Sequence, residues 1–288
     1  MKTLTIFTPA YNRAHTLSRT YESLLRQTCD DFEWLIVDDG SKDSTKALVE
    51  GWIQEGKISI WYIHQQNQGM HGAHNTAYRN IHTELNTCID SDDYMPDNAV
   101  ETIINFWKAH GSDKYAGIIG LDCTENGNII GTSFPEGMTE TTLNAFYAKG
   151  GKGDKKLVYR TDVIKQYPEY PIFEGEKYVS LGYKYLLIDQ DYPLLTLNKP
   201  LVVVEYQQDG SSMNMYRQYW NNPKGFAFIR KVDMKLKFES CIHYVSSSIR
   251  SKNTHFIAES PLPGLTILAI IPGIILYSFL KYKNSKNQ

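Results

Sequence analysis

Three aspartates within four positions, Asp90, Asp92 and Asp93, are the residues of this chain that most directly suggest chemistry. They follow an apolar run that ends at Ile89, so we expect them at the end of a strand. Carboxylates this close repel one another unless a cation lies among them, and hard oxygen ligands suit Mg²⁺ or Mn²⁺. The alternative is a solvated acidic turn that caps a helix beginning near Asp97. The cluster is therefore a candidate metal and phosphate site, and its surroundings must decide between the two.

The elements that must position this cluster are short β-branched runs alternating with longer amphipathic stretches over the first 122 residues. The predicted strands are residues 4–8, 34–38, 58–63, 85–90 and 117–121. The predicted helices are residues 15–27, 44–55, 70–81 and 97–110. Repeated βα units of this size predict a parallel, doubly wound α/β sheet with helices on both faces. Such sheets bind ligands beyond the carboxyl ends of their strands.

A polar loop follows each of the first four predicted strands, as that rule requires. The loops are residues 9–13, 38–41, 64–69 and 90–93. Because parallel strands end at the same edge of a sheet, we expect all four loops to lie together. One such loop could be accidental, but four indicate a binding site for a small anion.

Single residues in these loops have both a binding and a structural explanation. Tyr11 can stack on a nucleobase or simply pack at the sheet edge. Asp38 and Asp39 end an apolar strand, where a carboxylate can accept the N3–H of uracil or a ribose hydroxyl. The Gly40-Ser41 pair that follows also makes a good turn. The residues alone leave this choice open.

The glycine-containing stretch 67–75 allows close approach of the backbone and leads into a helix N-terminus, which favours negative charge. Gly69, His71 and Asn75 are its candidate contacts to the ligand. Taken singly, His71 and His74 are more typical of a helix surface.

Composition narrows the class of partner. A chain of 288 residues can form one large or two small domains, and its net charge of −2 argues against a nucleic-acid binder. The cysteines are scattered without metal-ligand spacing, so we expect buried thiols in a reducing compartment. They are Cys29, Cys88, Cys123 and Cys241. The apolar stretch near Met1 is too short for a signal peptide, so we expect the catalytic part in the cytoplasm.

An apolar, uncharged stretch, residues 262–280, lies near the C-terminus. Its length is at the lower limit of the ~17 to 25 residues that span a bilayer. Pro272-Gly273 in its middle favours a kinked span or an interfacial segment. Positive charge flanks it, with Lys281, Lys283 and Lys286 on the C-terminal side. We predict a membrane-associating tail at residues 261–288, and the alternative is a buried C-terminal helix of a soluble protein.

Three motifs, in this order and spacing, resemble those of the family 2 glycosyltransferases. They are TPAYNR at residues 8–13, VDDGSKDST at 37–45 and DSDDY at 90–94. The resemblance is strong over residues 3–122 and weaker to about residue 212. It implies the GT-A fold, a Rossmann-like, mostly parallel sheet flanked by helices, and an inverting transfer from a nucleotide-sugar donor.

The resemblance also implies roles for the acids. Asp39 first and Asp38 second would contact the base, while Asp90 and Asp92 form a DxD motif that binds a divalent ion, Mn²⁺ or Mg²⁺, bridging the donor's diphosphate. The candidate nucleotide-sugar contacts are Pro9, Tyr11, Asn12, Arg13, Asp38, Asp39, Gly69, His71, Asn75, Asp90 and Ser91. Many members have lysine where Met70 stands, so a cationic contact to the diphosphate must come from elsewhere, for example from His71 or Arg13.

The acceptor hydroxyl needs a base, which the resemblance places in residues 173–178. We prefer Glu176 to Glu174 because it is closer to the aromatic Tyr178, although a glycine separates the two acids here. The alternative is that both acids simply lie in the first turn of a helix predicted at residues 173–185.

The predicted organisation is a GT-A domain, a helical extension and the apolar tail. The bounds are 1–212, divided into a nucleotide-sugar half (1–122) and an acceptor half (123–212, with a strand-like run at 200–206), then 213–260 and 261–288. We expect transfer from a UDP-sugar to a glycan or glycolipid in cell-surface polysaccharide assembly, at the cytoplasmic face of the cell membrane.

Two other functions have different sequence requirements. A sugar-nucleotide nucleotidyltransferase should have a glycine- and lysine/arginine-rich loop after its first strand, where this chain has Pro9-Ala10-Tyr11-Asn12. A non-catalytic, membrane-bound nucleotide-binding scaffold should have lost acids that this chain keeps.

Overall fold

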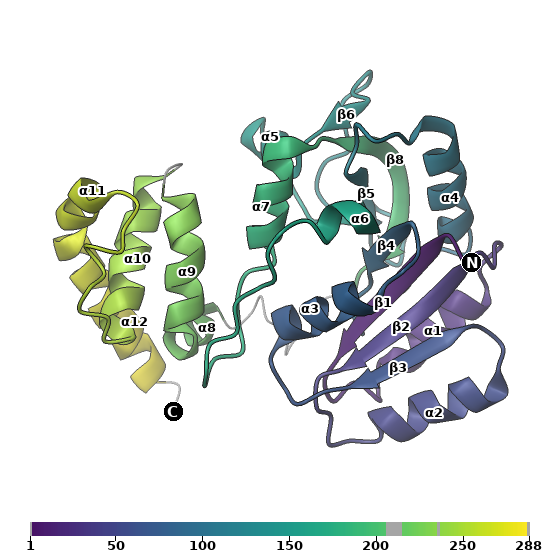
Figure 1. Cartoon of the computed structure of the whole chain (residues 1–288), viewed down its shortest axis with the longest axis horizontal. Helices are drawn as coiled ribbons and strands as arrows, with labels where there is room; N and C mark the ends of the chain where they lie inside the picture. Colours follow the sequence, from purple (N-terminus) through teal and green to yellow (C-terminus); the bar gives the residue numbers. More distant parts are fainter. Residues whose placement is uncertain (1, 206–214, 235–236, 287–288) are drawn as a thin grey trace. The chain divides into compact units, whose positions relative to one another are not determined.

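The computed structural model describes residues 2–205, 215–234 and 237–286 (Figure 1). The chain forms two compact units, which we call the sheet unit and the helical unit. The sheet unit comprises residues 1–67, 72–169 and 184–206, and the helical unit comprises 68–71, 170–183 and 207–288. The predicted boundary near residue 212 lies outside the described residues.

The sheet unit is built on a mixed sheet with the strand order β3-β2-β1-β4-β7-β5-β8-β6. The strands are β1 (Leu4–Ala10), β2 (Phe32–Asp38), β3 (Ile60–His64), β4 (Leu85–Cys88), β5 (Gly117–Cys123), β6 (Glu140–Thr141), β7 (Lys155–Arg160) and β8 (Leu194–Val203). Strands β3, β2, β1 and β4 pair in parallel. Strand β7 runs antiparallel between β4 and β5, and β5 pairs in parallel with β8.

Helices cover both faces of this sheet (Figure 1). They are α1 (Leu17–Leu25), α2 (Thr45–Glu55), α3 (Met70–Asn80), α4 (Ala99–His110), α5 (Leu143–Ala148), α6 (Thr161–Ile164) and α7 (Gly182–Asp191). The alternation along β1 explains the two layers: Ile6 joins the core formed with α1, α2 and α4, whereas Phe7 packs edge-on against His74 and Tyr78 of α3. The predicted α/β sheet flanked by helices is confirmed.

All strands and helices predicted before residue 122 occur, with bounds shifted by a few residues. Beyond that point the predictions are less accurate. The helix predicted at 173–185 begins only at Gly182, so the alternative explanation, that Glu174 and Glu176 simply lie in its first turn, is wrong. Gly175 in this segment adopts a φ of 78°, which does not continue a right-handed helix. Of the strand-like run 200–206, residues 200–203 are the end of β8, residues 204–205 are not in a strand, and Tyr206 lies outside the described residues.

The helical unit contains α8 (Met215–Asn221), α9 (Pro223–Asp233), α10 (Phe238–Arg250), α11 (Pro263–Leu268) and α12 (Ile270–Ser285). Helix α10 is central and contacts α9, α11 and α12. Its buried Tyr244 and Val245 form a small core with Ala269. The apolar stretch 262–280 is therefore divided between two helices. Among the helices that the structure describes, none combines the length and apolarity needed to cross a bilayer.

Candidate active site

The loops after the first four strands meet at one edge of the sheet. In the parallel register, Ala10 pairs with Asp38 and Asp38 with His64, so β1, β2 and β3 end at the same level. Phe7 pairs with Cys88, the last residue of β4. This sheet edge therefore gathers the polar loops, as the sequence predicted.

The β1 loop is fastened to the β2 loop by side chains. Asn12 adopts a φ of 55°, a left-handed conformation that asparagine tolerates. Its backbone N–H donates to Ser41 Oγ at 2.8 Å, and its side-chain oxygen accepts the backbone N–H of Lys42 at 2.8 Å. The Arg13 N–H donates to Thr45 Oγ1 at 3.1 Å. These bonds hold the loop that carries Tyr11, whose side chain is exposed.

Asp38 is fully buried, and both of its oxygens accept hydrogen bonds. Oδ1 accepts the Ser41 N–H at 2.7 Å, and Oδ2 accepts the Tyr62 hydroxyl at 2.5 Å. Burial and the carboxylate of Asp38 raise the pKa of Tyr62, which keeps that hydroxyl a donor. The geometry gives Asp38 the task of shaping the turn.

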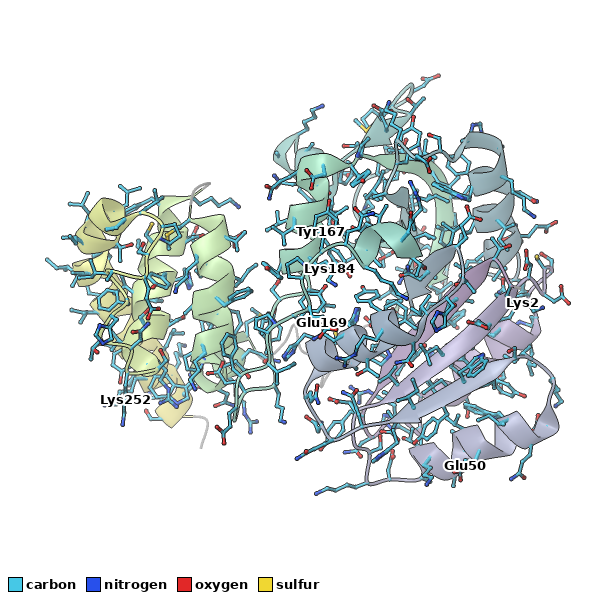
Figure 2. All side chains as sticks on the ribbon, viewed as in Figure 1. Lys2, Glu50, Tyr167, Glu169, Lys184 and Lys252 are labelled. Atoms are coloured by element: carbon cyan, nitrogen blue, oxygen red, sulfur yellow. The ribbon has the colours of Figure 1, made fainter. Side chains whose placement is uncertain are left out.

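Asp39 is oriented by a chain of side-chain hydrogen bonds. Gln65 Nε2 donates to Asp39 Oδ1 at 2.7 Å, while Gln65 Oε1 accepts the Thr76 hydroxyl at 2.5 Å. Arg79 Nη2 donates to Thr76 Oγ1 at 3.0 Å and Nη1 pairs with Glu169, a residue labelled in Figure 2. Because the amide of Gln65 is held from both ends, its N–H group is aimed at Asp39.

The histidines of α3 are buried, so the predicted helix-surface positions are wrong. His71 and His74 are each 1 % exposed. His74 Nδ1 lies 3.2 Å from the Tyr78 hydroxyl, beneath β1. His71 Nδ1 accepts the Val179 N–H at 3.3 Å, and burial, with the nearby charge of Lys177, lowers the pKa of His71 to about 4. At neutral pH His71 is therefore uncharged, which does not fit the expected cationic contact.

Gly69 and Asn75 are also enclosed. Gly69 has a φ of 84°, and a Cβ there would collide with the Lys177 carbonyl oxygen. Only glycine fits this position, where two backbone segments of the helical unit touch. Asn75 is buried on α3, in the same helical face as His71.

The acids after β4 divide into two kinds. Asp90 is exposed and Asp92 half-buried, whereas Ser91 and Asp93 are buried. Asp93 Oδ1 accepts the Glu205 N–H at 3.2 Å, and its carbonyl accepts the Thr20 hydroxyl at 2.7 Å. Burial raises the pKa of Asp93 to about 8. Asp93 thus holds the turn and leaves Asp90 and Asp92 as the metal candidates.

The alternative, an acidic helix cap, is not observed: α4 is preceded by Asn98 at its N-cap position. Within the described ranges, no group of three or more His, Cys, Asp or Glu residues is arranged to hold a metal. Two accessible carboxylates nevertheless suit Mg²⁺ or Mn²⁺, because such ions take their remaining oxygen ligands from water and substrate phosphates.

Sequence inspection missed two residues beside this cluster. Lys156 on β7 donates from Nζ to the Cys88 carbonyl at 2.8 Å, and its charge interacts with Asp90, Asp93 and Asp122. Asp122, near the end of β5, is buried, its Oδ1 has no hydrogen-bond partner among the described residues, and burial raises its pKa to about 6. Asp122 could have been found, since it follows an apolar strand as Asp38 does. Lys156 could not, because β7 was not predicted.

A hollow of about 530 Å³ lies elsewhere in the sheet unit. Its lining includes Glu84, which precedes β4, and Arg160, which ends the antiparallel β7. These residues mark the amino ends of the parallel strands, the edge opposite the polar loops. We therefore do not assign it to the site.

The two candidate bases lie in the helical unit. Glu176 is buried, and its Oε1 and Oε2 accept the N–H groups of Lys224 and Gly225, each at 2.9 Å. These amides belong to the first turn of α9, so Glu176 caps that helix, where negative charge is favoured. Glu174 is exposed.

The glycosyl transferase family 2 model matches residues 5–167, more than half of the chain and the part that carries all four loops. The chain belongs to glycosyl transferase family 2. The fold agrees: residues 1–349 of TarS from S. aureus, in complex with UDP-GlcNAc, superpose with a TM-score of 0.58 at 19 % identity, covering 100 % of this chain and 93 % of that fragment.

Another structure with this fold is the mannosyltransferase PcManGT from Pyrobaculum calidifontis in complex with GDP-Man and Mn²⁺. It has a TM-score of 0.56 at 16 % identity and covers 98 % of this family 2 member and 83 % of that chain. At these identities the likeness is one of fold, which confirms the GT-A type.

Among sequence relatives, the Escherichia coli β-1,3-glucosyltransferase WfgD, named for UDP-Glc and α-D-GlcNAc-diphosphoundecaprenol, is 25 % identical over 73 % of this chain and 79 % of its own length. Two further matches are shorter. The GlyA glycosyltransferase of Streptococcus pneumoniae is 33 % identical over 35 % of this chain, which spans only 14 % of GlyA. The chain likewise spans 19 % of the chondroitin synthase of Escherichia coli.

Proposed function

We propose that this family 2 member is an inverting, metal-dependent glycosyltransferase that moves a sugar from a UDP-sugar to a hydroxyl of a glycan or glycolipid. The observation that carries the proposal is the shared sheet edge, where Asp39, held by Gln65, and the accessible Asp90 and Asp92 follow parallel strands. A nucleoside diphosphate donor has a base, which one acid can bind, and a diphosphate, whose metal ion a pair of acids can bind.

The donor is bound by groups with distinct tasks. Asp39 accepts the N3–H of the base, and the exposed ring of Tyr11 stacks on the base. Asp90 and Asp92 would hold the divalent ion, Mn²⁺ or Mg²⁺. When bound, that ion supplies positive charge to stabilise the departing diphosphate. Arg13 remains the proposed protein cation for the phosphates, since buried His71 is neutral.

The acceptor hydroxyl loses its proton to an acid of the segment 173–178 as it attacks the anomeric carbon. Taking up that proton would weaken the hydrogen bonds that buried Glu176 accepts from α9, whereas Glu174 is exposed. We therefore propose Glu174 as the base and Glu176 as the residue that fixes the segment. This reverses the preference drawn from sequence order.

Names of similar proteins support the donor and acceptor classes. TarS was solved with UDP-GlcNAc, and WfgD is named for a UDP-sugar and a lipid diphosphate-linked acceptor. TarP of S. aureus, 27 % identical over 58 % of this chain and 49 % of its own length, is named for poly(ribitol-phosphate). We propose a similar role in cell-surface polysaccharide assembly, at the cytoplasmic face of the membrane, with the apolar C-terminal residues as the attachment.

The test is thermal stabilisation and donor hydrolysis with UDP- and GDP-sugars, each with Mn²⁺, Mg²⁺ or a chelator. We expect UDP-sugars to raise the Tm only with metal, and Asp92→Ala to abolish the rise. Asp30→Ala, an exposed acid outside the site, is the matched control. Stabilisation by UDP that is equal with chelator, or an Asp92→Ala variant that responds like the parent, would refute the metal-dependent donor site.

A further inference from the structure

Helices α11 and α12 carry many exposed aliphatic and aromatic side chains. On α12 they recur at helical spacing, so they share one face. They are Ile271, Ile274, Ile275, Phe279 and Tyr282, preceded on α11 by Leu265, Ile267 and Leu268. Exposed fractions of 68 % for Leu268, 73 % for Ile271 and 64 % for Ile275 are high for such residues. Scattered apolar side chains need no explanation, but a repeated exposed face on one helix does.

The opposite side of the same helices forms part of the core of the helical unit. Ala269 and Leu280 are buried, and a Cβ at Gly273 would collide with Val245 of α10. Asn284 Nδ2 also donates to the Tyr216 carbonyl of α8 at 3.2 Å. Since this side already faces α8 and α10, the helices cannot turn their exposed set inward without dismantling the unit.

Positive charge lies beside the apolar face. Lys281 and Lys283 are exposed in the last turns of α12, Lys286 is exposed at its C-cap position, and residues 260–288 contain no aspartate or glutamate. Lys286 lies 4.7 Å from the ring centre of Tyr282, which places an amphipathic ring among the ammonium groups. An apolar stripe ending in tyrosine and lysine is the composition of helices that lie at a lipid interface.

The geometry favours lying on a bilayer over crossing it. The apolar stretch is broken at Ala269, where α11 ends and α12 begins. The Thr266 hydroxyl in this stretch pairs locally, with Oγ1 2.6 Å from Ser260 Oγ. On α12 the exposed apolar side chains lie on one side only, and a spanning helix would need apolar side chains all round.

We propose that the exposed face of α11 and α12 docks in the plane of a bilayer rich in anionic phospholipids. The aliphatic side chains enter the acyl boundary, while the three lysines contact lipid phosphates. The inference builds on the proposed membrane location but not on the sugar-transfer reaction. Of the two alternatives that the sequence left open, a span and an interfacial segment, the proposal selects the interfacial segment.

The test is co-sedimentation of the full chain with vesicles of phosphatidylcholine alone or with phosphatidylglycerol, without nucleotide or sugar. We expect binding to the anionic vesicles that weakens as salt is added. Ile271→Ser with Ile275→Ser should lower the partition coefficient about tenfold or more, because isoleucine burial is lost. Ile53→Ser, an exposed isoleucine on α2, is the matched control and should bind like the parent.

Lys281→Gln with Lys283→Gln should weaken binding to anionic vesicles and leave the weaker binding to phosphatidylcholine unchanged. Thermal melts show whether each variant is folded. Equal partitioning of the isoleucine variant and the parent would overturn the proposal. So would a parent that ignores vesicles and instead sediments as a dimer that the isoleucine variant dissociates, since the face would then join two copies. Donor hydrolysis, measured without lipid, fails or succeeds separately.

Discussion

At the scale of single residues, the polar loops after the first strands are ordered mainly by side chains that form hydrogen bonds to neighbouring loops. Asn12 joins the β1 and β2 loops, Asp38 closes the turn, and Gln65 aims its amide at Asp39. Such bonds are directional, so each fixes the orientation of the groups that it joins. The residues next to the ligand candidates therefore matter as much as the candidates.

Replacing Gln65 by leucine tests this positioning role. The variant removes the bond to Asp39 and leaves Thr76 without its acceptor, so we expect UDP affinity to fall about fivefold to tenfold, or roughly 1 kcal/mol. Isothermal titration with UDP and Mn²⁺ measures it. Gln66→Leu, at the neighbouring exposed glutamine, should leave the affinity unchanged. Equal affinities for both variants would show that Gln65 does not orient Asp39.

Lys156 is expected to stabilise the acids around it. Its replacement by methionine removes the main nearby cation of the buried Asp122, at a cost of about 3 kcal/mol in the free energy of unfolding. Asp122→Asn in the same chain should recover part of that loss, because one buried charge is removed. Urea denaturation of the four members of this double-mutant cycle measures the coupling. Additive losses would argue against an interaction between Lys156 and Asp122.

At the scale of elements, the segment before α7 is attached to the start of α9. Glu176 caps α9, Asn222 Oδ1 accepts the Lys177 N–H at 2.7 Å, and a Cβ at Gly225 would collide with the Tyr178 carbonyl. A loop without regular structure is thereby held in one conformation. The two acids of the segment consequently have different surroundings, although only one residue separates them.

This difference predicts opposite phenotypes for two conservative substitutions. Glu176→Gln should lower the unfolding free energy by about 1 kcal/mol, as the loss of a charged helix cap does, with a smaller effect on kcat. Glu174→Gln should leave the Tm unchanged and reduce kcat at least about a hundredfold if Glu174 is the base. Thermal melts and steady-state kinetics separate the two roles. A large kcat loss confined to Glu176→Gln would return the base to Glu176.

At the scale of the whole molecule, the apolar tail contributes both to the core of the helical unit and to its exposed surface. Ala269 and Leu280 complete the core of the helical unit, while Ile271 and Ile275 face outward. Removing this segment would also remove part of the core. The stability of the unit and its association with membranes are therefore coupled in any truncation.

Deleting residues 262–288 should accordingly lower the Tm as well as vesicle binding. The deletion exposes the side of α10 that holds Tyr244 and Val245, and burying such side chains contributes several kcal/mol together. Differential scanning calorimetry of the deletion and of Ile271→Ser, which should melt like the parent, distinguishes core from surface. A deletion variant with the parent's Tm would show that the tail adds nothing to the core.

The sequence by itself determined the βα order of the first 122 residues, the four polar loops and the acids Asp39, Asp90 and Asp92, because periodicity and strand-end chemistry are local properties. Only the tertiary structure decided what depends on distant segments. The insertion of β7 brings Lys156 beneath the acidic loop, α3 turns its histidines inward, Glu176 finds α9, and the tail divides at Ala269. Each of these follows from long-range packing, which no window of neighbouring residues encodes.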